Sequence, residues 1–416
     1  MARVEATRQS GPWGIVVFLS VAFVINYIDR EVVFAIFPLL QRDLRFSPTQ
    51  LGLAGSLFTW TYSLSMPVAG RLADIVQRRW MVCASLVLWS IATLGTTFSY
   101  SIAQFLFWRV VMGITEALYV PAAIALITDA HPGRTRSRAL SIHGLAQFAG
   151  ITVGGWFGGW AGEHIGWRSG FGLLAVLGLS YSGVLFWGFQ QPQTQFAQKS
   201  SGSPVAIFRS RCYIVLCLLF FTFCAMLWVL YTWLPAHVYE TFHVSLAASG
   251  FVATAYLQFS SAAGVLAGGF AGDALSNRQR AGRFYIAAAG LFLSAPFAVA
   301  AFQTQSLRGL KFSACGFGLF AGLLIANVVS SAYDVVAPAD FGLASGVLNM
   351  IGGLGSGAAV LLAGIFKDSL GVGTIMLYFA LAAMALSIGL WAVVARRFES
   401  ERLRASGRSL AAPVPG

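Results

Sequence analysis

An all-α integral membrane protein is the fold class that this sequence predicts, and three observations support it. Residues of the set AVILMFWYC make up 57% of the 416 residues. Charged residues make up only 10%, against roughly 25% in an ordinary soluble domain. The mean hydropathy is +0.73. A soluble protein of this composition has too few polar side chains to cover its surface, so soluble globular, disordered and fibrous classes are excluded.

Twelve apolar stretches are long enough to cross a bilayer, which takes about 20 residues each. Their approximate bounds are 13–38, 50–73, 80–99, 101–129, 139–162, 169–189, 212–237, 247–271, 283–303, 307–333, 342–366 and 371–394. A polar segment rich in Gln, Ser and Pro divides them six and six. We therefore predict an N-terminal six-helix bundle at 1–189, a cytoplasmic linker at 190–211, a C-terminal six-helix bundle at 212–394 and a cytoplasmic tail at 395–416.

The distribution of basic residues predicts the orientation in the membrane. With the N-terminus inside, 19 of the 27 Lys and Arg residues fall in cytoplasmic tails and loops, and six fall on the other side. Cytoplasmic loops of membrane proteins collect Lys and Arg, so we expect a multi-pass protein of the plasma membrane with both termini cytoplasmic. The lack of N-x-S/T sequons favours a bacterial inner membrane. This topology also explains the formal charge of +12 without a nucleic-acid partner.

The two halves of the sequence look like copies of one unit. Gly70 and Asp74, after the second stretch, correspond at an offset of 199 residues to a glycine and Asp273 after the eighth. The sequence around Asp129 matches the sequence around Asp334 at an offset of 205 residues. A duplicated six-helix unit is typical of secondary transporters.

The loop after the second stretch suggests a gate. Its Asp74 is placed to face a helix N-terminus of the opposite half, where the helix dipole favours an anion. Its Arg78 or Arg79 is placed to pair with Asp129. We assign to this cytoplasmic gate Gly70, Asp74, Arg78, Arg79, Asp129 and Asp273. The alternative is ordinary positive charge on an inside loop.

Four ionisable residues lie deep within predicted spans: Asp29 and Arg30 in the first, and Arg109 and Glu116 in the fourth. Glu31 is also in the first span but nearer its end. A charge at the bilayer centre costs about 2.5–3.5 kcal/mol on insertion scales, so these side chains must face the bundle interior and find partners. Seven residues separate Arg109 from Glu116, which places both on one helix face. The corresponding positions of the second half carry no charge, which favours a functional role over a static ion network.

The loop from Gly70 to Asp74, followed by Arg78 and Arg79, resembles the loop signature of the major facilitator superfamily, although Ile75 and Gln77 depart from it. The resemblance covers the twelve spans, the duplicated loop and the central linker. It implies the major facilitator fold, in which 12 transmembrane helices form two six-helix pseudo-repeats.

Two branches of that superfamily are similar at the charged positions. The run NYIDR in the first span (Asn26 to Arg30) and Arg109 with GITEALYVPAA in the fourth resemble the spinster-like transporters. The Asp-Arg pair and the Arg-x6-Glu spacing also resemble the anion:cation symporter branch. The resemblance implies that Asp29 and Glu116 exchange protons. It also implies that Arg30 and Arg109 contact an anionic substrate or tune those acids.

Uncharged polar side chains within the spans are further candidates for a substrate cavity. They are Tyr27, Tyr62, Tyr119, Gln147, Tyr231, Tyr256, Gln258, Asn327 and Asn349. For each, the alternative is a hydroxyl or amide that bonds to a neighbouring helix. The recurring GxxxG spacing in stretch 139–162 predicts close helix packing.

These features predict a secondary active transporter, proton-coupled, that moves an organic anion or an anionic amphiphile by alternating access. The alternative is an uncoupled facilitator or an exporter of the lysolipid or sphingolipid type. The sequence has no H-E-x-x-H, G-x-S-x-G or P-loop motif, so we do not expect an enzyme. We expect no cofactor and no metal, since no histidine has a second ligand in register. The expected partners are protons, a small anionic or amphiphilic substrate and the lipid bilayer, and we expect a monomer.

Overall fold

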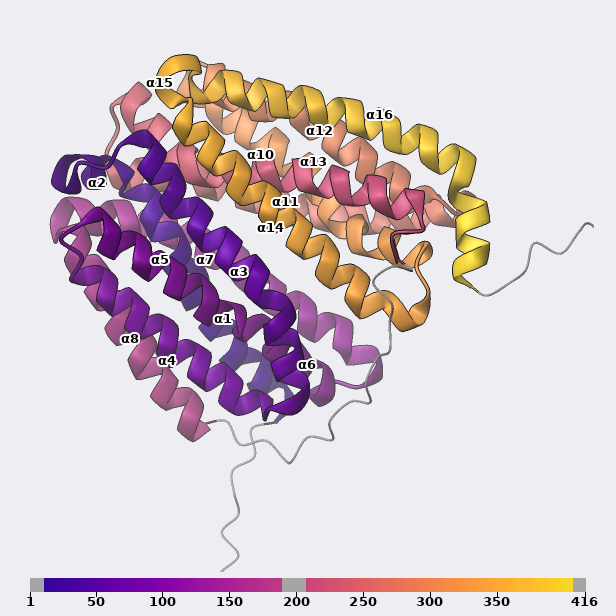
Figure 1. The fold of residues 1–416 in the computed structure, drawn as a ribbon, viewed down its shortest axis with the longest axis horizontal. Coiled ribbons are helices and arrows are strands. Elements are labelled where there is room, and N and C mark those ends of the chain that lie inside the picture. Colours follow the sequence, from indigo (N-terminus) through magenta and orange to yellow (C-terminus); the bar gives the residue numbers. More distant parts are fainter. Residues whose placement is uncertain (1–10, 189–206, 407–416) are drawn as a thin grey trace, which may run out of the picture. The chain divides into compact units, whose positions relative to one another are not determined.

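The computed structural model of the protein describes residues 11–188 and 207–406 (Figure 1). Within these two ranges the regular elements are helices, and no strand is present. The helices long and apolar enough to cross a membrane number ten in the described residues. Two more, α3 and α7, have 28 and 29 residues and a more polar composition. The predicted all-α membrane fold is confirmed.

The chain divides into two compact units. Unit 1 comprises Met1–Ala197 and Val238–Thr254, and unit 2 comprises Gln198–His237 and Ala255–Gly416. Two helices, α10 and α11, therefore run from one unit into the other along the chain. The predicted linker at 190–211 lies outside the described residues up to residue 206. The division into two six-helix bundles stays a prediction.

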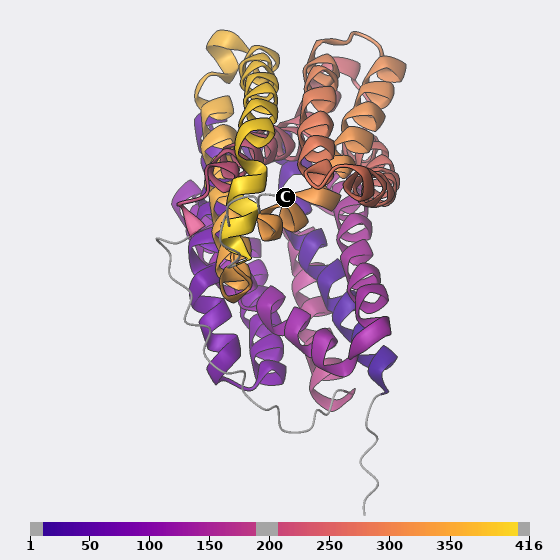
Figure 2. The ribbon, with the colours of Figure 1, turned by 90° about the vertical axis from the view of Figure 1, so that its right-hand side faces the viewer.

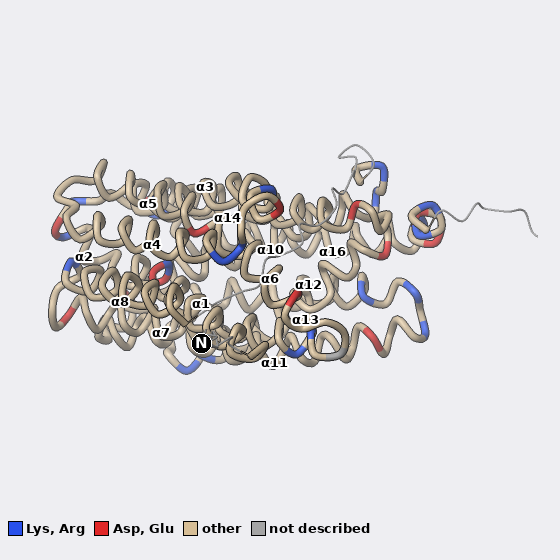
Figure 3. Tube along the Cα trace, turned by 90° about the horizontal axis from the view of Figure 1, so that it is seen from below, with Lys and Arg blue, Asp and Glu red and all other residues tan. Residues whose placement is uncertain are grey.

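The helices of unit 1 follow the predicted stretches closely. They are α1 (Pro12–Ala35), α2 (Phe37–Leu44), α3 (Pro48–Ile75), α4 (Arg78–Thr97), α5 (Ile102–Ala117), α6 (Tyr119–Ala130), the short 3-10 turn η1 (Gly133–Thr135), α7 (Arg136–His164) and α8 (Trp167–Gly188). The fourth predicted span thus consists of two helices, α5 and α6. The charged residues drawn in Figure 3 lie mostly at helix ends and in connections, which leaves long stretches of the helices uncharged.

The remaining helices correspond to the second set of predicted stretches, except that α16 continues to Ala405, into the predicted tail. They are α10 (Arg211–Phe242), α11 (Leu246–Arg278), α12 (Gly282–Gln303), α13 (Leu307–Asp334), the 3-10 turn η2 (Pro338–Asp340), α14 (Phe341–Ile365), α15 (Lys367–Leu370) and α16 (Val372–Ala405). Within unit 2, α12 packs side by side with α13 and α16 (Figures 1 and 2).

Two prolines account for the helix breaks in unit 1. Pro38 has no N–H to donate to the carbonyl of Phe34, and the helix divides there into α1 and α2. Pro121 has no N–H to donate to the carbonyl of Ala117, and the helix divides there into α5 and α6. The second break follows directly after Glu116, one of the buried acids.

Glycines on α7 allow it to approach α1 closely. A Cβ at Gly150 would lie 2.6 Å from Cβ of Tyr27, and one at Gly158 would lie 2.8 Å from the carbonyl oxygen of Val32. These glycines share one face of α7 with Gly154, at the four-residue spacing seen in the sequence. The interpretation of the GxxxG pattern as close helix packing is therefore confirmed.

The connection between α1 and α3 is fixed at Asp43. Its Oδ2 accepts a hydrogen bond of 3.0 Å from the indole nitrogen of Trp167, the first residue of α8. Its Oδ1 accepts one of 2.9 Å from Nε of Arg42. Burial alone would raise the pKa of Asp43, but these two hydrogen bonds hold the pKa of that carboxyl below its ordinary value.

Candidate functional site

Three consecutive ionisable residues of α1 are buried in unit 1. Asp29 is 1% exposed, and Arg30 and Glu31 are each 4% exposed. Successive helix residues point about 100° apart, so each side chain faces a different neighbouring helix. Asp29 lies beside Thr93 on α4, and Arg30 reaches α5. Glu31 faces α7, where a Cβ at Gly154 would lie 2.8 Å from the Glu31 Cβ.

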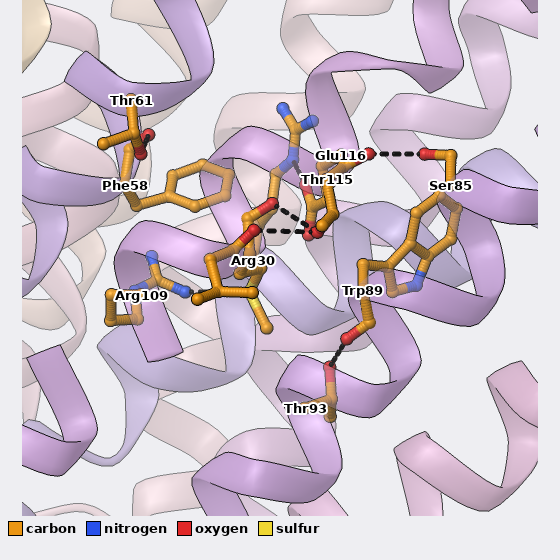
Figure 4. A network of polar contacts seen from close by, with 11 residues as sticks. Arg30, Phe58, Thr61, Ser85, Trp89, Thr93, Arg109, Thr115 and Glu116 are labelled. Carbon is orange, nitrogen blue, oxygen red and sulfur yellow. Dashed lines mark hydrogen bonds and ion pairs between the residues drawn. The ribbon is translucent and has the colours of Figure 1, made fainter. Parts of the chain in front are cut away.

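Arg30 and Glu116 form a buried ion pair that joins α1 to α5 (Figure 4). Nε of Arg30 donates to Oε2 of Glu116 at 2.5 Å, and the two side chains are 5% and 0% exposed. The other carboxylate oxygen of Glu116 and Nη2 of Arg30 have no hydrogen-bond partner among the described residues. Each member of the ion pair can therefore form a further hydrogen bond.

Aromatic rings surround the guanidinium of Arg30. Its Cζ lies 4.3 Å from the ring centroid of Tyr62, 4.7 Å from that of Tyr27 and 5.2 Å from that of Phe58. Such cation–π contacts favour the charged form of the side chain in a place without bulk water. Tyr27 and Tyr62 are partly exposed, so the cluster reaches the surface of unit 1 on their side.

Arg109, also on α5, is fully buried and makes no ion pair among the described residues. Its Nε donates to the carbonyl oxygen of Ala54 at 3.2 Å, and Nη1 lies 3.3 Å from the sulfur of Met112. Its guanidinium stands 4.5 Å from the ring centroid of Phe58, which therefore contacts both arginines. Two helical turns separate Arg109 from Glu116 along α5, and Arg30 is the arginine that pairs with Glu116.

The cluster contains one more acid than the four charges counted from the sequence. Glu31, nearer the end of α1, is as buried as Arg30 and is the additional acid. Asp29 and Glu31 have no ion-pair partner in the described part of the chain, and neither oxygen of Asp29 accepts a hydrogen bond there. Three carboxyl groups thus share one buried region with two guanidinium groups. Asn26, buried on the same helix with an unpartnered amide, is a further polar member that the sequence argument missed.

The uncharged candidates divide between this cluster and other places. Tyr27 and Tyr62 belong to the cluster, whereas Tyr119 is buried in the helix core and donates its hydroxyl to the carbonyl of Leu19. That bond matches the structural alternative considered for Tyr119. Gln147 is partly exposed on α7.

In unit 2, the amide of Gln258 donates to the hydroxyl of Tyr231 at 2.8 Å. The amide of Asn327 donates to the carbonyl of Gly268 at 2.8 Å, and Asn349 is exposed and bonds within its own helix. Tyr256 is partly exposed, with the ammonium of Lys311 5.2 Å from its ring centroid. Their roles in a substrate cavity stay predictions.

The residues assigned to a gate form ion pairs within each unit. Arg78 bonds to Asp129 in unit 1, as one of the two expected pairings. In unit 2, Nη2 of Arg283 lies 2.9 Å from Oδ1 of Asp273, and its Nη1 lies 3.8 Å from Oδ1 of Asp334. The offset of 205 residues that relates Asp129 to Asp334 also relates Arg78 to Arg283, so this pair occurs in both halves.

The other gate residues make different contacts. Asp74 is exposed and makes no ion pair with any described residue. Arg79 donates to the carbonyl of Phe186 at 2.5 Å instead of to an acid. Gly70 has open space around the position of a Cβ. A gating role for these residues stays a prediction.

The family model of the Major Facilitator Superfamily matches residues 19–306 and 216–415. The chain belongs to this superfamily. Protein spinster homolog 1 of Rattus norvegicus is 31% identical over 219 residues, which are 49% of this chain and 39% of that protein. The match therefore spans about two-fifths of the length of that relative. The D-galactonate transporter of Escherichia coli O6:H1 is 23% identical over 400 residues, 88% of this chain and 92% of that protein.

A solved structure shows the same fold over nearly the whole chain. It is a bacterial homolog to the human lysosomal transporter spinster, with a TM-score of 0.76 and 20% sequence identity. The superposition covers 96% of this chain and 99% of that one. The resemblance to the major facilitator superfamily and to its spinster-like and anion:cation symporter branches is thus confirmed, and these relatives are transporters, not enzymes.

Proposed function

We propose that the protein is a proton-coupled secondary transporter that moves an organic anion across a plasma membrane by alternating access. The observation that carries the proposal is the buried cluster on α1 and α5, with its three carboxyl and two guanidinium groups. Ionisable groups within membrane spans usually mark substrate and proton pathways. A relative that aligns over most of the chain is named for an anionic sugar acid, D-galactonate.

Arg30 is the residue best placed to hold the anion. Its Nη2 has no partner in the described residues, and its planar fork suits a carboxylate. The neighbouring rings of Tyr27 and Tyr62 are partly exposed, so a ligand can approach from their side. Arg109 is fully buried behind Phe58 and acts on the charge balance of the site from a distance.

The excess of acids provides the proton coupling. With every group ionised the cluster carries a charge of −1, and a buried carboxylate without a cation partner is unfavourable. One bound proton makes the cluster neutral, and a second gives it a positive charge that matches a monovalent anion. Protonation of Glu116 also frees the guanidinium of Arg30, because the substrate carboxylate and Glu116 compete for the same donors. Proton uptake and anion binding therefore favour each other, which supports symport.

The remaining features of the proposal come from the sequence. Both termini lie in the cytoplasm, the membrane is a bacterial inner membrane and the working unit is a monomer. The ion pairs Arg78–Asp129 and Arg283–Asp334 hold the helix ends on the side of the basic loops. Asp74 contacts the opposite half when that side closes.

Uptake by proteoliposomes under an imposed pH gradient tests the proposal. A thermal-shift screen with organic acids, sugar acids and lysolipids, with D-galactonate as the first probe, selects the substrate. We expect the wild-type protein to concentrate the selected anion, and Glu116→Gln and Asp29→Asn to lose concentrative uptake but retain counterflow exchange. The exposed acids Glu240 and Asp368 give matched controls as Glu240→Gln and Asp368→Asn.

Two results would contradict the proposal in different ways. If both cluster variants concentrate the anion as the wild type does, the acids do not couple transport to protons. If the wild type equilibrates the anion without responding to the pH gradient, the protein is an uncoupled facilitator.

A further inference from the structure

An apolar groove of about 650 Å³ lies between α4 and α8 of unit 1, two helices that run side by side (Figure 1). It is lined by Trp80, Cys83, Ala84, Val87, Leu88, Ser182, Gly183, Phe186 and Trp187. None of these residues belongs to the ionisable cluster, so the groove is separate from the proposed transport site.

The groove faces outward, where acyl chains surround the protein. Large apolar side chains on its walls are exposed, including Leu88 at 42%, Phe186 at 41% and Trp187 at 80%. Both helices are long and apolar enough to cross a membrane. Tryptophans such as Trp80 and Trp187 concentrate where the hydrocarbon meets the headgroups, which places this end of the groove at that level.

A guanidinium group stands at the same end. Cζ of Arg79 lies 5.1 Å from the ring centroid of Trp80 and 5.9 Å from that of Phe186. One of its nitrogens bonds to the carbonyl of Phe186, in the last turn of α8, which fixes the side chain there. Its Nε is buried and has no hydrogen-bond partner in the described chain. Its neighbour Arg78 is paired with Asp129, whereas Arg79 has no carboxylate partner in the same residues.

We propose that this groove binds an anionic phospholipid, with one acyl chain along α4 and α8 and the phosphate on Arg79. The apolar walls match the chain, and the guanidinium matches the phosphate in charge and in hydrogen-bond geometry. The cation stands where the headgroup of a lipid in this leaflet lies. A zwitterionic lipid contacts the same apolar walls but brings no net negative charge to Arg79.

Photo-crosslinking identifies the occupant directly. The purified full chain is reconstituted with phosphatidylglycerol or phosphatidylcholine that carries a diazirine in one acyl chain, and the labelled peptides are mapped by mass spectrometry. We expect saturable labelling of residues 80–88 and 182–187, about fivefold stronger for phosphatidylglycerol, which corresponds to about 1 kcal/mol per basic residue near a headgroup. Arg79→Gln abolishes this preference, and Arg79→Lys retains most of it.

Filling the groove gives a second, independent test. A Cβ at Gly183 meets nothing within 4 Å, so Gly183→Leu projects into the groove without a clash. We expect it to suppress labelling by both lipids, as Ala84→Leu does from the opposite wall. Gly389 on α16 also has open space around its Cβ position, so Gly389→Leu is the matched control and keeps the wild-type labelling pattern.

Three results would overturn the proposal. The first is equal labelling by the two lipids at the same concentration, well below saturation. The second is labelling that continues unchanged in Gly183→Leu and Ala84→Leu. The third is a crosslink between the groove and residues 190–205 in place of a lipid adduct, which would assign the groove to the chain's own segment.

Discussion

The Arg30–Glu116 ion pair makes a quantitative prediction about stability. Removing one partner of a buried ion pair leaves the other charge uncompensated and costs about 3–5 kcal/mol. Arg30→Gln leaves Glu116 in that position and also removes the cation–π contacts, so we expect the full loss. Glu116→Gln keeps one amide oxygen that can accept a hydrogen bond from Arg30, and the charge of Arg30 still faces three aromatic rings. We therefore expect a smaller loss in unfolding free energy, about 2–3 kcal/mol.

The double variant separates the pair from its surroundings. With both charges removed, neither residue of the pair is left as an uncompensated charge, so the double loss is smaller than the sum of the single losses. We expect a coupling energy of about 1.5–3 kcal/mol, the range for hydrogen bonds to charged groups. The measurement is reversible denaturant unfolding of the purified protein in mixed micelles, followed by circular dichroism.

A second cycle on the same helix serves as the control. Arg109 is buried on α5 like Glu116 but makes no hydrogen bond to it, so the cycle of Arg109→Gln with Glu116→Gln has a clearly smaller coupling energy. Losses that add within about 0.5 kcal/mol for Arg30 and Glu116 would refute the ion pair as a stabilising contact. Equal coupling energies in the two cycles would show that Glu116 responds to the electrostatic field of the whole cluster and not to a specific hydrogen bond with Arg30.

Three further predictions concern the same unit. Arg30→Lys keeps the charge but loses the planar fork, so we expect anion binding measured by calorimetry to weaken by about 1–3 kcal/mol, whereas Arg109→Lys leaves affinity unchanged and shifts the pH profile of uptake. Gly154→Val places methyl groups against α1, so we expect a loss of about 1–3 kcal/mol in unfolding free energy, against little change for Gly144→Val, where space is open. Asp43→Asn lowers the free energy of unfolding by about 1 kcal/mol at neutral pH. The pKa of Asp43 is lower in the folded than in the unfolded protein, so the difference between variant and wild type disappears as the pH falls through the folded-state pKa. A difference that stays constant from pH 7 to pH 3 would contradict this.

Much of the fold follows from composition alone. Length and apolarity locate each membrane helix, because a bilayer leaves few alternatives to a long apolar helix. The break in the fourth span was not predicted, although Pro121 supplies the signal: a proline within a long apolar run removes one backbone donor. The arrangement of the two units depends on long-range packing, which cannot be predicted from the positions of spans and loops in the sequence.

The sequence indicates which charged side chains are buried in unit 1, but not how they pair. Burial of Asp29, Arg30, Arg109 and Glu116 follows from charges in apolar runs. Which arginine meets Glu116 depends on how α1 and α5 are rotated against each other, and a single sequence does not state that. The burial of Glu31 does not follow from its place in the span, because it depends on the close approach of α7 at Gly154.

The contrast between the two halves distinguishes structural charges from functional ones. The Arg78–Asp129 pair recurs in unit 2 as Arg283–Asp334, at the offset of 205 residues that relates the two halves. The central charges do not recur: the positions that correspond to Arg109 and Glu116 are alanines.

Those alanines, Ala314 and Ala321, are buried, so unit 2 fills these positions of its interior without a charge. Buried charges are costly, and unit 1 nevertheless carries five of them in the cluster on α1 and α5. A stabilising role does not account for groups that the homologous unit lacks. The asymmetry therefore supports a role of the cluster in binding and proton exchange. It predicts that replacing a polar side chain of unit 2, as in Gln258→Leu, changes substrate affinity without changing the response of uptake to a pH gradient.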